Sequence, residues 1–470
     1  MEREHLLISG GNPLHGELIL PGAKNAITKL LVASILSDKP STFTHVPDIE
    51  DVQITADLCR EIGSVIDWNK KDRTIRIETP RITTTFIPQR FSGANRIPIL
   101  MLGVLLGKTD EDIIVPTVGG CDLGSRPVDF HIKALQALGA CIEYRQMKSE
   151  GAYFARAHKG LAGALISLPY PSVGATENAL LAAVRAKGTT RIEGAALEPE
   201  VLDLILYLQK MGSQIDIRDQ RTIIIKGLDT TREVFHEVIP DRNVAVSYAC
   251  AALATGGQIT LHRTQHSDLV SFCCTLNQLG AHWEMKENTA GTSGQSIQFG
   301  QKGSKPLSGN LLIETQVHPG FMTDWQQPFG VLLTQVQGAS SIHETVYEKR
   351  FGYMQTLQEM GADIYFNSEC SGPSPCRFRH QEVPHSATIV GPSKLNAKAI
   401  TVPDLRGGFA YVIAALCAKG ESTLYNVHFL SRGYEDIAST LSALGAEIKH
   451  VIPQKPSPEQ KEKKQLLATA

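Results

Sequence analysis

The sequence predicts an α/β fold built of six related units, three in each of two domains. The chain has 470 residues, two or three times the size of a single hydrophobic core, so at least two cores are expected. A phrase that ends a helix recurs six times, and a helix that is apolar nearly all round precedes each copy. Each unit is therefore expected to run strand, buried helix, strand, exposed helix and further strands.

The repeated phrase is an amphipathic run that ends in a glycine followed by Ser or Ala, as at 208–213. Glycine readily takes the left-handed conformation that closes a helix. A strand-like segment follows each phrase, such as 214–217 or 447–450. The six glycines, which lie 68 to 84 residues apart, are Gly63, Gly139, Gly212, Gly280, Gly361 and Gly445.

The second helix of each unit lacks a polar face, which places it in the centre of a domain. The six candidates are 27–36, 97–106, 178–186, 244–255, 329–336 and 409–418. Segments 284–310 and 366–390 are rich in Gly, Ser, Pro and charge, and we expect them to be loop insertions. The tail from Pro453 is polar and charged and is expected to be disordered.

Composition excludes several classes of protein. The 46 Lys and Arg residues against 48 Asp and Glu give a net charge of -2, which argues against nucleic acid or an anionic membrane as the main partner. The longest apolar runs, 99–106 and 411–418, are far shorter than the roughly 18 residues of a membrane span. Nine cysteines without CxxC spacing, and no HExxH motif, predict a reduced cytoplasmic protein without a metal site or cofactor.

Polar residues stand at the start of the predicted buried helices. In a repeated architecture these helix ends lie on one face of each domain, where backbone N–H groups attract anions. One interpretation is that Asp and Ser only cap the helices. Four basic groups among them favour the other interpretation, an anionic substrate held between two domains. The residues are Lys24, Asn25, Arg96, Ser172, Asp241, Arg242, Asp324, Asp404 and Arg406.

The glycine-rich segment 119–127 contains the sharpest local pattern. Gly119 and Gly124 have the spacing of a phosphate loop, but Ser125 stands where a nucleoside triphosphate loop needs lysine. Cys121 lies near Arg126 and a predicted helix start, and both features lower the pKa of a thiol. The pattern favours a reactive thiolate over a buried structural cysteine.

With these residues in place, the sequence resembles the enolpyruvyl transferase family over nearly the whole chain, from Gly16 to about Ile448. The resemblance implies a two-domain inside-out α/β barrel, with three βαβαββ repeats and buried central helices in each domain. It implies one domain at 22–239, a second made of 1–21 with 240–452, and an active site between them. The matching segments are 21–26, 121–129, 172–176, 318–321, 323–324, 344–346, 350–351 and 432–435.

The resemblance also implies a reaction and two substrates. The enolpyruvyl group of phosphoenolpyruvate would pass to the 3-hydroxyl of UDP-N-acetylglucosamine with release of phosphate, the first committed step of peptidoglycan precursor synthesis. Cys121 would donate a proton, and Asp324 would be the base for the sugar hydroxyl. The residues implied for phosphoenolpyruvate are Lys24, Asn25, Arg126, Arg350, Arg406 and Arg432. Those implied for the UDP-sugar are Arg96, Arg126, Pro127, Val128, Asp129, Phe130, Ser172, Val173, Gly174, Asp324 and Val346.

The sequence departs from the family pattern on the acceptor side. Tyr170 and Pro171 precede Ser172 where a lysine is common, so one diphosphate contact is either missing or replaced. Leu100 stands where a sugar-side tryptophan is often found. These departures leave open an enolpyruvyl transferase that acts on another UDP-sugar or on a nucleoside.

A noncatalytic paralogue that binds a UDP-sugar and regulates a partner is the other alternative. The presence of both Cys121 and Asp324 disfavours it, because binding alone needs no general acid. A nucleotide-binding dehydrogenase is disfavoured because no GxGxxG follows the first strand. The oligomeric state does not follow from the sequence.

Overall fold

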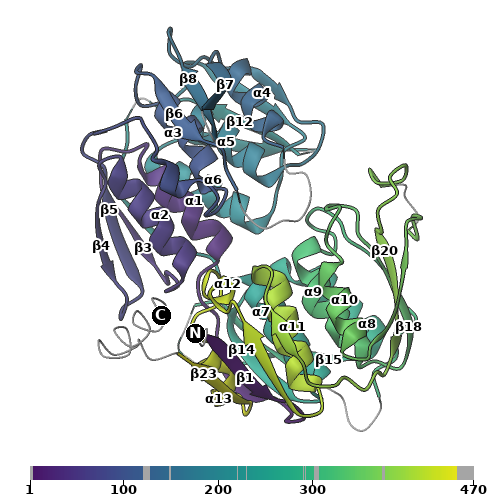
Figure 1. The fold of residues 1–470 in the computed structure, drawn as a ribbon. Helices are drawn as coiled ribbons and strands as arrows, with labels where there is room; N and C mark the ends of the chain where they lie inside the picture. The colour runs from purple at the N-terminus through teal and green to yellow at the C-terminus, as the bar shows by residue number, and fades with distance from the viewer. Residues whose placement is uncertain are drawn as a thin grey trace, which may run out of the picture.

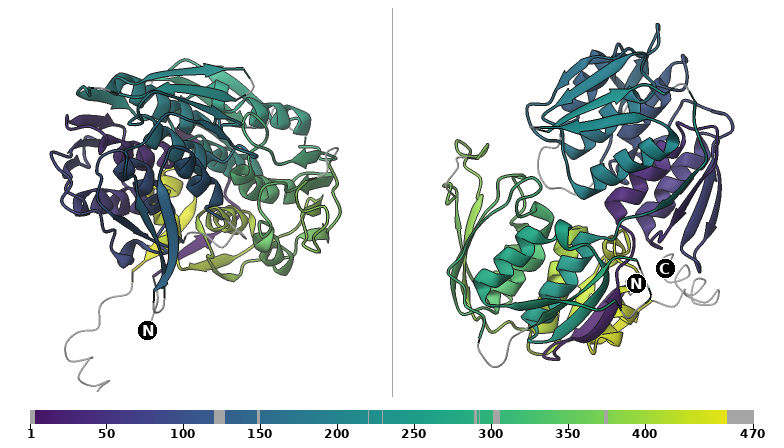
Figure 2. Two further views of the ribbon diagram at one scale, coloured as in Figure 1. Left: turned by 90° about the horizontal axis from the view of Figure 1, so that it is seen from above. Right: turned by 180° about the vertical axis from the view of Figure 1, so that it is seen from behind.

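A computed structural model describes residues 4–119, 127–147, 150–219, 221–228, 230–288, 291, 293–300, 306–372 and 376–452 (Figure 1). Cys121, Arg126 and the tail 453–470 lie outside the described residues. Two bodies of helices and sheets are visible, one purple to teal and the other teal to yellow, with the N-terminal strands in the second (Figures 1 and 2).

Six sheets occur in the described residues, and five of them share one strand order. An edge strand pairs in parallel with its neighbour, and two antiparallel strands follow. In the sixth sheet an isolated parallel bridge, Phe86 to Ile114, stands where the edge strand would be. The repeated order confirms the six predicted units.

The strands of the first body form three sheets. These are β13 (Val234–Glu237), β3 (Ser41–Thr44), β5 (Thr74–Glu78) and β4 (Val65–Asn69); β9 (Leu165–Ser167), β10 (Thr189–Glu193), β12 (Thr222–Lys226) and β11 (Gln214–Arg218); and β6 (Ile113–Pro116), β8 (Glu150–Arg156) and β7 (Cys141–Met147).

The second body has three sheets of four strands. These are β2 (His15–Ile19), β14 (Gln258–Thr264), β16 (Gln295–Gly300) and β15 (His282–Lys286); β17 (Leu312–Glu314), β18 (Gly338–His343), β20 (Ser386–Gly391) and β19 (Asp363–Asn367); and β21 (Ala399–Thr401), β22 (Glu421–Tyr425), β1 (His5–Ser9) and β23 (Glu447–Val451).

Six buried helices lie inside the two bodies, as the apolar patterns predict. The structure differs in where most of them begin, because their first turns contain the polar residues that the apolar patterns left out. The buried helices are α1 (Lys24–Ser34), α3 (Leu100–Leu106), α5 (Val173–Ala183), α7 (Arg242–Ala254), α9 (Thr323–Thr334) and α11 (Leu405–Cys417).

The outer helices end as predicted, since all six repeat glycines have positive φ, between 76° and 123°. No helix in the part of the chain that the structure describes is long and apolar enough to cross a bilayer. The outer helices are α2 (Glu50–Glu61), α4 (Asp129–Ala137), α6 (Pro199–Met211), α8 (Val270–Leu279), α10 (Gly352–Glu359) and α13 (Ile437–Ala443), and α12 (His428–Ser431) is a single short turn.

Two chain crossovers join the bodies. β2 precedes α1 in the chain but pairs with β14, and β13 precedes α7 but pairs with β3. The crossing segments are bonded to each other: Gly22 bridges Pro240, and the Ala23 N–H donates to the Ile239 carbonyl at 2.7 Å. The helix starts that face this junction therefore come from both bodies.

Each body has its own hydrophobic core. One core is drawn from residues 23–238, and the other from residues 6–20 together with 244–448. With sheets outside and helices inside, the architecture is the predicted two-domain inside-out α/β fold. We propose domain boundaries at 22–239, and at 1–21 with 240–452, because the two cores separate there.

Candidate active site

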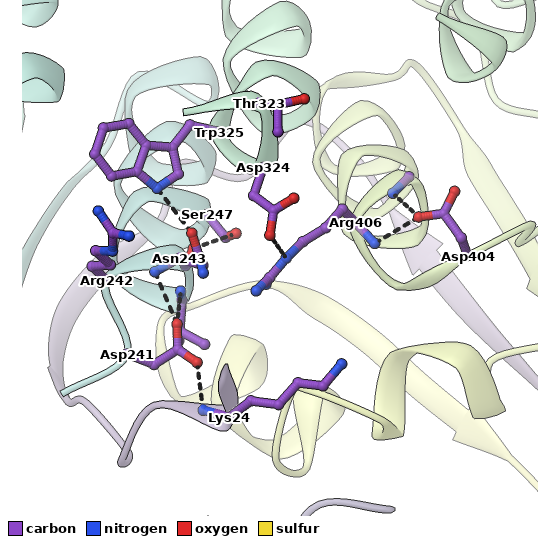
Figure 3. Close-up of polar contacts among 12 residues, drawn as sticks. Lys24, Asp241, Arg242, Asn243, Ser247, Thr323, Asp324, Trp325, Asp404 and Arg406 are labelled. Atoms are coloured by element: carbon purple, nitrogen blue, oxygen red, sulfur yellow. Dashed lines mark hydrogen bonds and ion pairs between the residues drawn. The ribbon is translucent and has the colours of Figure 1, made fainter. Parts of the chain in front are cut away.

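Asp324, in the first turn of α9, lies between two arginines that were predicted for the same site. Arg350 Nη2 is 2.6 Å from one carboxylate oxygen, and Arg406 Nε is 3.6 Å from the other (Figure 3 shows the second pair). Burial disfavours the charged guanidinium of Arg350, but the nearby carboxylates, Asp324 first, outweigh burial and raise its pKa. The Asp324 side chain keeps 24% of its surface exposed, so a ligand can reach it.

Hydroxyl and aromatic side chains hold the Arg406 guanidinium in place. Its Nη1 donates to the Tyr434 hydroxyl at 3.0 Å, and that hydroxyl lies 2.8 Å from Ser247 Oγ. The Tyr434 ring stacks on Phe409, with centroids 4.4 Å apart. Asp404 accepts a hydrogen bond from the backbone N–H of Arg406 at 3.0 Å. It therefore caps α11, as expected if the acidic residues at the helix starts only cap their helices.

Lys24 and Arg432 come from opposite bodies and meet at Asp51, in the first turn of α2. Lys24 Nζ lies 2.7 Å from one Asp51 oxygen, and Arg432 Nε lies 3.0 Å from the other. Burial alone would raise the pKa of Asp51, but the two cations outweigh burial and lower it. The Lys24 backbone N–H also donates to Asp241, the cap of α7, at 3.0 Å (Figure 3).

Sequence reasoning missed Asp51. An acidic residue in the first turn of a helix is typical of simple interaction with the helix dipole, so nothing in the local pattern distinguishes it. Only the tertiary structure shows that Asp51 joins two predicted phosphate ligands across the junction.

The two segments predicted for the UDP-sugar are 126–130, of which 127–130 are described, and 172–174; they are neighbours at the starts of α4 and α5. A Cβ at Gly174 would lie only 3.0 Å from the His131 ring, so the absence of a side chain allows this approach. Burial, with a further contribution from the charge of Arg96, lowers the pKa of His131 to about 3. His131 is therefore neutral. Arg96, which is predicted to lie on the sugar side, is close enough for its charge to act on His131.

Glu344 connects the predicted Val346 to the start of α9. It accepts hydrogen bonds from the Val346 and Tyr347 backbone N–H groups at 2.8 and 3.0 Å, and from Thr323 Oγ1 at 2.9 Å. Burial raises the pKa of Glu344, which these donors and Arg350 oppose. The Val346 loop is thus fixed beside the start of α9, by a residue to which the sequence assigned no role.

Two predicted residues make local contacts. Asp129 forms an exposed ion pair with Lys133, 3.3 Å away within α4. The Asn25 carbonyl accepts a hydrogen bond from Lys29 Nζ at 2.7 Å. Lys29 also lies 3.9 Å from a carboxylate oxygen of Glu177, in α5.

Glu177 is buried, and neither of its carboxylate oxygens has a hydrogen-bond partner among the described residues. Burial raises its pKa from 4.5 to about 7. The folded chain therefore retains a proton that the unfolded chain releases, and wild-type stability falls as pH rises through this window.

We expect Glu177→Gln to be more stable than wild type, by a margin that grows between about pH 5 and pH 8 to as much as ~3 kcal/mol. Urea unfolding across this range measures the margin, with Glu111→Gln at an exposed position as the control. A margin independent of pH would contradict the expectation.

The chain matches known proteins over almost all of its length. The family described as EPSP synthase (3-phosphoshikimate 1-carboxyvinyltransferase) matches residues 8–441. A UDP-N-acetylglucosamine 1-carboxyvinyltransferase of Protochlamydia amoebophila is 54% identical over 450 residues, 96% of this chain and 95% of that protein. One of Chlamydia abortus is 46% identical over 442 residues, 94% of this chain and 97% of that protein.

Solved structures of low sequence identity share the fold. The enolpyruvyl transferase NikO from Streptomyces tendae superimposes with a TM-score of 0.81 at 22% identity, covering 96% of this chain and 100% of that one. An EPSP synthase from Acinetobacter baumannii gives a TM-score of 0.71 at 17% identity, with 96% and 100% covered.

Proposed function

The chain belongs to the EPSP synthase family of enolpyruvyl transferases, and on that premise we propose that it transfers the enolpyruvyl group of phosphoenolpyruvate to the 3-hydroxyl of UDP-N-acetylglucosamine. The observation that carries the proposal is the name shared by relatives 54% and 46% identical over nearly their whole length. The reaction would release phosphate and open peptidoglycan precursor synthesis in the cytoplasm.

Lys24 and Arg432, with Arg126, would bind the phosphate of phosphoenolpyruvate. A phosphate offers several anionic oxygens, which guanidinium and ammonium groups bind by charge-assisted hydrogen bonds. Asp51 keeps the first two cations together at distances of 2.7 and 3.0 Å. The phosphate would add to this preformed group, and Asn25 stands beside Lys24 at the start of α1.

Arg350 and Arg406 would bind the carboxylate of the same substrate, since planar guanidinium matches a carboxylate. In the structure both arginines pair with Asp324. A substrate carboxylate would take over part of this pairing, which frees an Asp324 oxygen for the sugar hydroxyl. Substrate binding would in this way prepare the base.

The UDP-sugar would bind on the other side, between Arg96, the loops 127–130 and 172–174, and Val346. Glu344 fixes the Val346 loop against the helix of Asp324. The acceptor would thereby lie next to the base.

The proposed chemistry begins with two proton transfers. Cys121 acts here in its thiol form, which a lowered pKa makes a stronger acid, and gives its proton to the methylene carbon. Asp324 takes the proton of the sugar hydroxyl as the oxygen bonds to the central carbon. The C–O bond to phosphate then breaks, and a proton leaves the new methyl group for the Cys121 thiolate, which restores both the double bond and the thiol. The proton held by Asp324 leaves with the phosphate or passes to solvent. Phosphate is the only leaving group.

Phosphate release from phosphoenolpyruvate, measured with different acceptors, tests the proposal. We expect release with UDP-N-acetylglucosamine and a product heavier by one enolpyruvyl group by mass spectrometry. UDP-glucose and uridine serve as comparison acceptors. Faster release with either of them, or no release with any acceptor, would overturn the assignment.

Arg432→Met tests the phosphate site separately. One charged hydrogen-bond donor is worth about 1.5–3 kcal/mol, so kcat/KM for phosphoenolpyruvate should fall about tenfold to a hundredfold. The Kd for UDP-N-acetylglucosamine, measured by calorimetry, should change by less than about threefold, because Arg432 faces the phosphate. Arg73→Met removes an exposed arginine that pairs with Glu435 at the same junction and is the matched control. Equal losses for both substrates would place Arg432 elsewhere.

A further inference from the structure

Four potential metal ligands meet at one end of the sheet β17–β18–β20–β19. His343 is the last residue of β18, and His385 immediately precedes β20. Cys370 and Cys376 lie in the connection between β19 and β20. One ligand atom from each of the four residues lies within 4.8 Å of all the others.

The distances fit a tetrahedral zinc ion. With Zn–S of ~2.3 Å and Zn–N of ~2.0–2.1 Å, tetrahedral angles require about 3.8 Å between two sulfurs and about 3.5 Å between sulfur and nitrogen. The two cysteine sulfurs are 3.6 Å apart, and Cys370 Sγ is 3.5 Å from His385 Nε2. The sulfur separation is too long for a disulfide bond, whose length is about 2.05 Å.

The two ring nitrogens of His343 have different surroundings. Its Nδ1 lies 3.0 Å from a carboxylate oxygen of Glu314 on the neighbouring strand, and the Gly372 N–H also lies 3.2 Å from Nδ1. The Gly372 N–H can donate only to an unprotonated Nδ1, whereas the Glu314 carboxylate accepts from a protonated one. A metal bound at Nε2 would select the second form, with the proton on Nδ1 shared with Glu314. This Nε2 is buried and has no hydrogen-bond partner among the described residues.

His385 has the same arrangement. Its Nδ1 lies 2.9 Å from the Val383 carbonyl oxygen, to which it can only donate. The Nε2 atom is then an acceptor that faces Cys370. A carboxylate or a carbonyl behind the ligating histidine is the usual second contact of histidine–metal sites.

We propose that His343, Cys370, Cys376 and His385 bind a structural zinc ion. Two thiolates and two imidazoles are a typical closed zinc set, in which four protein ligands leave no position for a substrate. Each thiol would lose its proton to solvent as the metal binds. Two thiolates would balance the charge of the ion, which suits a site with two buried histidines.

The sequence gives no sign of this site, and the proposal departs from the sequence-based prediction of no metal site. The ligands are 27, 6 and 9 residues apart, without any CxxC or HxxxH spacing, and segment 366–390 was interpreted only as a loop insertion. Strand pairing, rather than spacing in the sequence, places residues of the site side by side, because Glu314 and Ser386 both pair with His343.

The metal would hold a loop that reaches the junction between the two bodies. Arg377 follows Cys376 directly, and its Nη2 donates to the carbonyl oxygen of Val346. Its guanidinium carbon lies 5.7 Å from the centre of the Tyr170 ring, in the segment before α5. Zinc would thus fix a cation beside the position where the family commonly has a lysine.

Metal analysis of the untagged, full-length protein tests the site without reference to activity. Protein expressed with added zinc and purified under reducing conditions should contain about one zinc ion per chain. Replacement by Co²⁺ should give the intense visible bands of tetrahedral cobalt and sulfur-to-cobalt charge-transfer bands. Cys370→Ser and Cys376→Ser should each lose the bound zinc, and Cys274→Ser, at an exposed cysteine on α8, should retain it.

Three results would overturn the site. The first is wild-type protein without stoichiometric zinc and without the cobalt spectrum, a measurement that no variant's folding affects. The second is a Cys370–Cys376 disulfide found by mass spectrometry in the reduced preparation. The third is zinc retained in both Ser variants, which would place the metal elsewhere.

Discussion

Cys121→Ala is expected to lower kcat by about a hundredfold to ten-thousandfold, because the methylene carbon of phosphoenolpyruvate loses its proton donor. Binding of UDP-N-acetylglucosamine should persist, since the proposed acceptor contacts come from Arg96, the two loops and Val346. Phosphate release at saturating substrates measures kcat, and calorimetry measures the affinity for the acceptor.

Two further variants separate acid catalysis from a structural effect. Cys121→Asp should retain more activity than Cys121→Ala, since a carboxylic acid also donates a proton. Cys141→Ala, at an exposed cysteine of β7, should behave as wild type. An epoxide that alkylates the family cysteine should label wild type but not Cys121→Ala. Full activity in Cys121→Ala, or labelling of another residue, would remove the proposed role.

The repeat was predictable because residue patterns within each unit indicate its helices. A glycine that closes a helix must take positive φ, and Gly63 and Gly445, at opposite ends of the repeat series, both do so. A helix with no polar face can only be buried, as α7 and α11 are. These two signals determine the number of units and their internal order without any long-range information.

Contacts between distant segments carry no such local signal. Asp51 looks like an ordinary acidic residue in the first turn of a helix. It nevertheless joins Lys24 to Arg432, which lies 381 residues beyond Asp51 in the chain. His343 and His385 are brought together by strand pairing, because His343 pairs with Ser386, the residue after His385. The resemblance to a family supplied the candidate site residues, but neither the resemblance nor the spacing could supply the residues that position them.

The sequence left two roles open for Asp324, a base or a helix cap, and its contacts argue against the cap. α9 is preceded by Met322 and has no side-chain cap, whereas the Asp324 carboxylate is paired with Arg350 and Arg406. Asp241 and Asp404, by contrast, do cap their helices. The structure therefore favours a functional carboxylate at 324.

Asp324→Asn should lower kcat by about a hundredfold to ten-thousandfold, the usual contribution of a general base, with a much smaller change in the Kd for UDP-N-acetylglucosamine. The melting temperature should fall as well, because two buried guanidiniums lose an anionic partner. Asp436→Asn is the matched control: Asp436 only caps α13, Asn caps equally well, and turnover should stay unchanged.

The ratio of these effects identifies the base. If Asp324 only neutralised the arginines, Asp324→Asn would weaken phosphoenolpyruvate binding and stability together while kcat at saturation stayed near that of wild type. A base acts chiefly in the transition state, so its loss appears in kcat even when both substrates are bound. Normal turnover in Asp324→Asn would transfer the role to Asp241 or Asp404, the remaining acids at the starts of the buried helices α7 and α11.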